Sequence, residues 1–212
     1  MATCATAVVL NAVARASEKE GSSPAAPAAG RAKASHKARA GHLFISANTY
    51  RRIPLFRYRR PREIFFENLQ FYRGKYIFRL YAYVLMPNHF HLLIDFPAQR
   101  ALVDFLRDFK SAIGIQIVDW LKADNRKELL SHLAVLQASR RYKDARYSVW
   151  QRDSYITPLL SVRIIRQKLR YIHENPVRAG LVVVPEDYPY SSARVYAGRG
   201  PTDVGVDLIE EP

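Results

Sequence analysis

The spacing of apolar positions predicts several strands in the first half of the chain. Between residues 89 and 96 apolar residues recur at every second position, which indicates a strand with two different faces. One face carries Phe90, Leu92, Ile94 and Phe96, and the other carries His89, His91, Leu93 and Asp95. Aromatic and β-branched residues predict further strands over 42–50 and 75–86.

Apolar residues spaced three or four apart predict three helices, over 61–74, 102–120 and 159–173. We expect the third to end near Asn175, because the residue before Pro176 is disfavoured in the helical region. Each helix carries one apolar stripe, so each should pack against a sheet.

A short fourth strand is expected to begin at Val149-Trp150-Gln151, whereas residues 122–148 are charged and show no clear period. Helices that cover one face of a mostly antiparallel sheet form an α+β sandwich. The order of strands and helices therefore predicts an α+β fold.

The composition shows that the chain is strongly basic. The 212 residues have a net charge of +14 and a pI near 10.1, which argues against an enzyme for small neutral metabolites and favours a polyanionic partner. The single cysteine, Cys4, excludes a disulfide framework and a cysteine-based zinc finger. No apolar run approaches the length of a membrane span, so we expect no membrane partner.

The chain divides into three predicted segments. Residues 1–41 form an extension rich in Ala, Pro, Ser and Lys, which we expect to be disordered or to reflect a start codon assigned too far upstream. A signal peptide is the less favoured alternative, because the apolar stretch 5–13 is short and has no basic residues before it. The folded domain is expected over 42–198, and 199–212 form an acidic tail. Since the basic and acidic ends offset each other, the net charge belongs to the domain.

His89 and His91 are the first residues that suggest chemistry. On a strand, residues i and i+2 point to the same side with Cα atoms about 6.6–6.8 Å apart, so two imidazoles can converge on one metal ion. Phe90 between them would anchor the strand in the core. Two ligands do not complete a metal site, so a third must come from elsewhere. The alternative is a pair of core histidines with a structural role.

Tyr171 differs from the other twelve of the thirteen tyrosines by its setting. It lies off the apolar stripe of the third helix and among basic residues, and Asn175 would share its face if the helix persists that far. A phenol with a pKa of about 10 is a poor nucleophile at neutral pH unless a base or a metal assists it. The spacing alone leaves both a catalytic and a structural role open for Tyr171.

The connection after the first strand interleaves arginines with aromatic residues, a mixture that suits phosphate contacts and base stacking. The alternative is a solvated basic loop. A weaker second basic patch comprises Arg140, Arg141 and Lys143. The candidate DNA-binding residues are Arg51, Arg52, Arg57, Arg59, Arg60 and Arg62, together with Arg178 beyond Tyr171.

Two segments resemble the single-tyrosine HUH transposases of small insertion sequences, and more closely their REP-associated tyrosine transposase branch. They are YAYVLMPNHFHLLI (Tyr81–Ile94) and KLRYIHENPVRAGLV (Lys168–Val182). HLFISANTYRRIPLF near the start and PEDYPYSSA at 185–193 agree with the same family. The resemblance spans about 42–196, and M-P-N-H-x-H-L followed by Y-I-H-x-N-P-V-R-A-G is a specific combination.

The resemblance implies a ferredoxin-like domain that binds single-stranded or hairpin DNA. It implies that His89 and His91 bind Mg²⁺ or Mn²⁺, with Asn175, one turn after the tyrosine, as third ligand. Tyr171 would attack the scissile phosphate and leave a 5′-phosphotyrosine and a free 3′-OH, so that DNA can be rejoined without ATP. The protein would act as a monomer or a homodimer in the bacterial cytoplasm, on the nucleoid.

The chain also departs from the family pattern. Arg140–Tyr147 replaces a commoner glycine-containing segment, and residues 1–41 match nothing in the pattern. Two other functions therefore stay open on the same fold. One is a nucleic-acid-binding protein that does not cleave, and the other is a metal-dependent phosphoesterase in which water attacks and Tyr171 is structural.

Overall fold

The protein is described by a computed structural model, which covers residues 41–97, 99–134 and 147–209. The predicted extension over 1–41 and the patch of Arg140, Arg141 and Lys143 therefore lie, apart from Gly41, outside the described residues. The strands are β1 (Gly41–Thr49), β2 (Arg79–Met86), β3 (His89–Phe96) and β4 (Trp150–Pro158). The helices are α2 (Arg59–Tyr76), α3 (Gln99–Ala123), α4 (Lys127–His132), α5 (Val162–Arg178) and α6 (Ala193–Tyr196), with 3-10 turns η1 (Tyr50–Arg52), η2 (Leu55–Arg57) and η3 (Pro185–Asp187).

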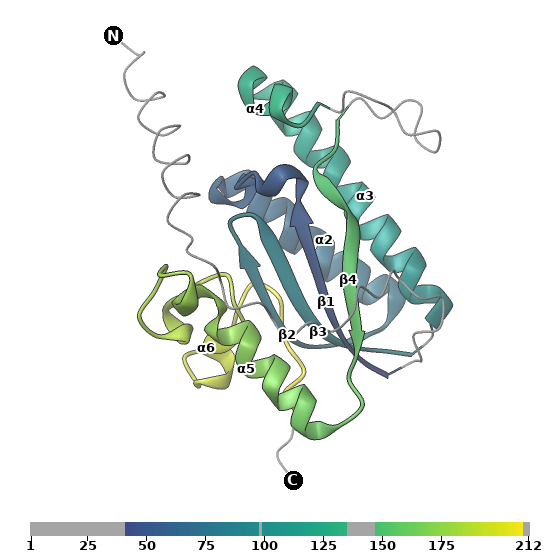
Figure 1. The fold of residues 1–212 in the computed structure, drawn as a ribbon, viewed down its shortest axis with the longest axis vertical. Helices are drawn as coiled ribbons and strands as arrows, with labels where there is room; N and C mark the ends of the chain where they lie inside the picture. Colours follow the sequence, from purple (N-terminus) through teal and green to yellow (C-terminus); the bar gives the residue numbers. More distant parts are fainter. Residues whose placement is uncertain (1–40, 98, 135–146, 210–212) are drawn as a thin grey trace. The chain divides into compact units, whose positions relative to one another are not determined.

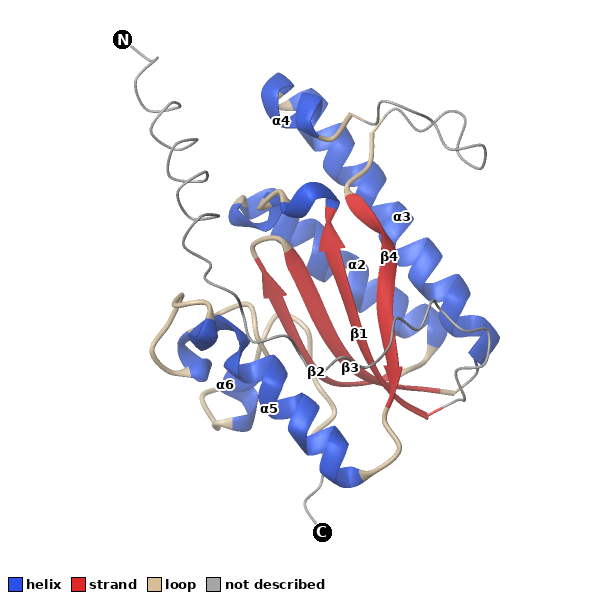
Figure 2. Ribbon diagram, viewed as in Figure 1, coloured by secondary structure: helices blue, strands red, loops and turns tan. Residues whose placement is uncertain are grey.

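The four strands form one sheet in the order β2-β3-β1-β4, and all neighbouring strands are antiparallel. The chain reaches this order through two strand–helix–strand units, with α2 between β1 and β2 and α3 between β3 and β4 (Figure 2). This is the split βαβ arrangement of ferredoxin-like domains. The predicted α+β, ferredoxin-like fold is confirmed.

Helices cover both faces of the sheet, whereas the sequence predicted helices on one face. Helices α2 and α3 lie on one side and α5 on the other (Figure 1). The alternating residues of β3 explain this, because Phe90 and Leu92 pack with α2 and α3, while Leu93 packs with Ile165 and Ile172 of α5. The face that carries His89 and His91 is therefore the face toward α5.

Helix α2 runs past Gly74, where the sequence predicted a stop. It ends at Tyr76, and Ile77 turns the backbone away in the left-handed region with φ 48°. The extra turn is stabilised by α3, since Tyr76 Oη donates to Asp108 Oδ2 at 2.7 Å. Strand β2 consequently begins at Arg79 rather than at residue 75.

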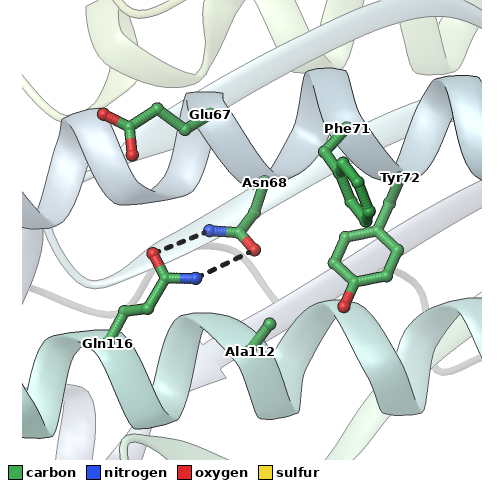
Figure 3. A pocket seen from close by; sticks show the side chains of 6 residues that line it. All are labelled: Glu67, Asn68, Phe71, Tyr72, Ala112 and Gln116. Atoms are coloured by element: carbon green, nitrogen blue, oxygen red, sulfur yellow. Dashed lines mark hydrogen bonds between the residues drawn. The ribbon is translucent and has the colours of Figure 1, made fainter.

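The outer side of the α2–α3 pair carries a shallow pocket (Figure 3). Asn68 of α2 and Gln116 of α3 exchange two hydrogen bonds at its floor, with distances of 3.3 and 3.4 Å. Phe71 projects beside it and is 64% exposed. This pocket lies on the side of the sheet away from the two histidines.

Helix α5 continues through Pro176, which corrects its predicted end near Asn175. Ser161 caps its start, and Pro176 lies buried inside the helix. The carbonyl of Asn175 accepts a hydrogen bond from Ala179 N at 3.1 Å, so the turn around the proline is closed. The conformational bias of a residue before proline is a preference, and the packing of Pro176 overrides it here. Asn175 thus remains helical and one turn from Tyr171.

The described part of the predicted acidic tail packs on the domain. Val204 is buried in the core beside α2 and α3, and Asp207 Oδ2 accepts hydrogen bonds from Leu80 N and Arg73 Nη2, both at 2.8 Å. The three-segment division of the chain stays a prediction. Among the described residues, no helix combines the length and the apolar character that a membrane span needs.

Candidate active site

Strand β3 and helix α5 bring the predicted site residues together. The ring centroids of His89 and His91 lie 4.9 Å apart, and that of Tyr171 lies 5.4 Å from that of His91. The Nδ2 atom of Asn175 lies 3.4 Å from Nε2 of His91. Two segments far apart in sequence therefore form one cluster of imidazoles, phenol and amide.

The tautomers of both histidines follow from their partners. Nδ1 of His89 lies 2.7 Å from Oδ1 of Asn88, which can only accept, so Nδ1 carries the proton. The Nδ2 group of Asn175 can only donate, so Nε2 of His91 is the unprotonated nitrogen. Each histidine thus has a lone pair on Nε2.

Burial keeps both imidazoles neutral. It lowers the pKa of His89 to about 4, with a contribution from the nearby charge of Arg52. It lowers the pKa of His91 well below its ordinary value, with smaller contributions from His89 and Lys168. Because metal ions bind the neutral form of imidazole, the pair is in its metal-binding state at neutral pH.

The donor set fits a hard divalent cation with water completing the coordination. Nδ1 of His91 is buried and has no hydrogen-bond partner within the described part of the chain, so the ring is held by packing and by Nε2. No group of three or more His, Cys, Asp or Glu side chains among the described residues could hold a metal ion. The amide of Asn175, beside Nε2 of His91, is a candidate for a third protein ligand through its Oδ1.

Aromatic rings and two cations surround Tyr171. The ring of Phe44 in β1 stacks on His91 at 5.2 Å, and Lys168 Nζ lies 4.7 Å from the centroid of Phe44 and 5.4 Å from that of Tyr171. The guanidinium of Arg178 lies 5.4 Å from the centroid of Tyr171. Lys168 was not among the predicted site residues, although its position three residues before Tyr171 places it on the same side of α5.

Helix α5 is tied to the sheet by a buried polar contact. His173 Nε2 lies 2.9 Å from Ser192 Oγ, which accepts a hydrogen bond from Tyr83 N in β2 at 3.0 Å. Burial lowers the pKa of His173 to about 4, so this contact uses the neutral imidazole. His173 therefore has a structural role that supports the placement of Tyr171.

The turn η1 carries two of the predicted arginines, of which Arg52 lies near His89. Thr49 fixes this turn, because its N–H donates to Asn88 O at 2.8 Å and its hydroxyl to Ile53 O at 2.7 Å. Arg51 and Arg52 are exposed and lie in the left-handed region, with φ of 51° and 54°. Such strain in two successive non-glycine residues is typical of functional sites.

The other predicted arginines are placed differently. Arg57 is exposed at the end of η2. Arg59 and Arg60 pair with acidic side chains of α2, at 2.6 Å to Glu63 and 2.8 Å to Glu67. Such surface pairs contribute little, so DNA phosphates could displace them.

Arg62 is the arginine of this group with the most internal contacts. It donates to the carbonyls of Phe56 and Arg57 at 3.2 and 2.8 Å, and its guanidinium lies 4.5 Å from the ring centroid of Tyr190. These contacts give it a structural role.

Parts of the chain are similar to known proteins. The family model described as "Transposase IS200 like" matches residues 42–133, which include the two histidines and end before Tyr171. A protein of Haemophilus influenzae named as a REP-associated tyrosine transposase is 30% identical over 118 residues, which cover 55% of this chain and 60% of that relative. The matched part is therefore less than two thirds of the relative's length.

A solved structure has a similar fold. The structure of a REP-associated tyrosine transposase bound to a REP hairpin matches with a TM-score of 0.52 and 20% identity, over 82% of this chain and 90% of that one. Residues 42–133 of this chain are therefore similar to the IS200-like transposase family.

Proposed function

We propose that the protein nicks and rejoins single-stranded DNA beside a hairpin, by transesterification through Tyr171. The observation that carries this proposal is the contact of Tyr171 with His91, whose ring centroids lie 5.4 Å apart, with Asn175 beside them. A hydroxyl nucleophile, two neutral imidazoles and an amide are groups that can support a metal-assisted phosphoryl transfer. Transposition or the processing of palindromic repeats would use this reaction.

In each step of the reaction one phosphodiester bond breaks and another forms. The Oη atom of Tyr171 loses its proton and attacks the phosphorus, and the bond from phosphorus to the 3′-oxygen breaks. The 3′-oxygen takes up a proton, so the products are a 5′-phosphotyrosine and a free 3′-OH. A 3′-OH then attacks the phosphotyrosine by the reverse step and releases the phenol.

His89, His91 and Asn175 would hold Mg²⁺ or Mn²⁺ through Nε2 of each imidazole and Oδ1 of the amide. When bound, the ion supplies positive charge for the phosphate oxygens and for the developing charge on the leaving 3′-oxygen. The chain's own cations assist, since Lys168 and Arg178 flank the Tyr171 ring, each at 5.4 Å from its centroid. Both are suited to bind non-bridging phosphate oxygens.

DNA is the partner that the charges support. Arg51 and Arg52 are exposed on η1, with Arg52 near His89, and Arg57 follows on η2. A hairpin is the form of DNA that we propose, because the protein of similar fold was solved with a REP hairpin bound. The net charge of +14 gives this binding a strong dependence on salt.

The test is to incubate the protein with labelled hairpin-bearing single-stranded oligonucleotides and Mn²⁺, and to separate the products on a denaturing protein gel. We expect a labelled band at the mass of protein plus DNA. Tyr171→Phe should abolish this band, whereas the control Tyr72→Phe, on the opposite side of the sheet, should retain it. Cut DNA without an adduct would instead identify a phosphoesterase, and binding without cutting a DNA-binding protein.

A further inference from the structure

The sheet face that carries the histidines extends beyond α5. Within the described residues α5 packs mainly on β2 and β3. Strand β2 is one edge of the sheet and β4 is the other edge (Figure 1). Phe44 of β1 is buried against α5, but the part of this face from Ser46 of β1, which is half-buried, to Tyr155 of β4, which is exposed, remains accessible. It is continuous with the proposed active site.

The strand register places one row of side chains on this face. Ser46 of β1 pairs with His91 on one side and with Tyr155 of β4 on the other. Residues paired across antiparallel strands point to the same side, so the three side chains lie in line. Neighbouring strands are about 4.8 Å apart, which places Tyr155 about 10 Å from His91 along the row.

The three side chains of this row differ in size and in exposed fraction. His91 is 6% exposed and Tyr155 is 41% exposed. Ser46 between them has a small side chain, so the ring of Tyr155 projects above the neighbouring surface of the sheet. Tyr155 has no hydrogen-bond or ring partner among the described residues, and its neighbours Ser154 and Ile156 point to the α3 side.

We propose that Tyr155 is a stacking platform for one nucleobase of the single-stranded DNA next to the scissile phosphate. This inference rests on the proposed function and adds a subsite to it. A phosphate at Tyr171 is held by Lys168, which lies over Phe44 of β1. From there the strand crosses β1 above Ser46, and the base of an adjoining nucleotide reaches the face of Tyr155.

The chemistry of an exposed tyrosine fits this ligand. Every base has a flat aromatic face, and stacking on an aromatic side chain contributes about 1–3 kcal/mol per base with little sequence preference. DNA would place phosphates on the basic residues near His89 and Tyr171 and a base on Tyr155, so one ligand accounts for both features. The platform therefore fixes the register of the strand at the site of cleavage.

The test is an abasic scan in the Tyr171→Phe background, where DNA is bound but not cut. The oligonucleotide is the hairpin that forms the adduct with the parental protein, and each nucleotide flanking the cleavage site is replaced in turn by an abasic one. We expect one position at which loss of the base weakens binding about tenfold. Adding Tyr155→Ala should weaken binding to intact DNA by about the same factor and abolish the effect of that abasic position.

Two variants separate stacking from other effects. Tyr155→Phe keeps the aromatic face and should behave like the parental protein in the scan. Phe71→Ala removes an aromatic residue that is 64% exposed on the opposite side of the sheet, and should leave every affinity unchanged. Melting temperatures of all variants should agree, since Tyr155 is exposed.

The outcomes distinguish this inference from the function on which it rests. If the adduct forms but Tyr155→Ala leaves the abasic scan unchanged, the stacking platform is wrong and the transesterase stands. If Tyr155→Phe loses as much affinity as Tyr155→Ala, the phenolic hydroxyl and not stacking makes the contact, which also overturns it. If no hairpin forms an adduct or binds, both proposals fail.

Discussion

The amide of Asn175 lies 3.4 Å from the imidazole of His91, across 84 positions of the sequence. This relationship depends on the continuation of α5 through Pro176, because a helix that ended earlier would release Asn175 from its face. It places an amide, which carries a possible oxygen ligand, next to two imidazoles. Substitutions of Asn175 can therefore test whether its side chain binds the metal ion.

Replacing Asn175 should change the metal requirement in two directions. Asn175→Asp supplies a charged oxygen, which hard divalent cations prefer to an amide, so half-maximal adduct formation should need less Mn²⁺. Asn175→Ala removes the oxygen and should need more. A titration of adduct yield against Mn²⁺ concentration measures both, and equal midpoints in the three proteins would exclude Asn175 as a ligand.

Lys168→Gln should slow adduct formation by about tenfold, the usual size for loss of one hydrogen bond to a charged group. DNA affinity should fall less, because many other cations remain. The matched control is Arg166→Gln, which removes a cation from the groove on another side of α5, beside His173 and Tyr196. Single-turnover rates check this prediction, and equal rates for the two variants would remove Lys168 from the reaction.

Arg51 is expected to favour DNA binding at the expense of stability. Arg51→Gly relieves a φ of 51° and should leave the free energy of unfolding unchanged or raise it by up to about 1 kcal/mol. It should also weaken DNA binding. The slope of log affinity against log salt concentration should become shallower by an amount that corresponds to about one fewer ion released on binding. Arg51→Ala loses the same charge but keeps the strain, so it should be less stable than Arg51→Gly in denaturant titrations.

The buried histidines should make the fold sensitive to acid. The folded-state pKa of His89 and of His173 is about 4, below the ordinary 6.5. Above pH 6.5 neither state takes up a proton, whereas between pH 6.5 and 4 the unfolded chain binds protons that the fold excludes. The free energy of unfolding should therefore fall as the pH drops through this window.

Denaturant midpoints at pH 7 and pH 4.5 measure this loss. The variant His173→Gln should show a smaller drop between the two pH values than the parental protein, because one titrating group is gone. A drop of the same size in both proteins would show that His173 contributes nothing to the acid sensitivity.

The sequence predicted the proximity of the candidate site residues better than it predicted the boundaries of the helices around them. The period of two in β3 predicts both that Phe90 is buried and that His89 and His91 share a face, since strand geometry alone fixes these relations. The spacing of Tyr171 and Asn175 depends likewise on helix geometry. Gly74 and Pro176 were wrong as helix ends, because packing against α3 and the sheet outweighs these local preferences.

Other features depend on contacts between segments that the pattern does not encode. Lys168 is positioned by Phe44 in β1, and Arg62 is held by hydrogen bonds to the carbonyls of Phe56 and Arg57 in η2. The row from His91 through Ser46 to Tyr155 follows from the register of three strands that are distant in sequence. Local periodicity does not determine such a register.

The position of Tyr171 and Asn175 on one helix has a consequence for control of the reaction. Tyr171 and Asn175 share α5, whereas both histidines belong to β3. Under the proposed function, separating α5 from the sheet would remove the attacking group and one ligand together. Cleavage would then require α5 to be docked on the sheet.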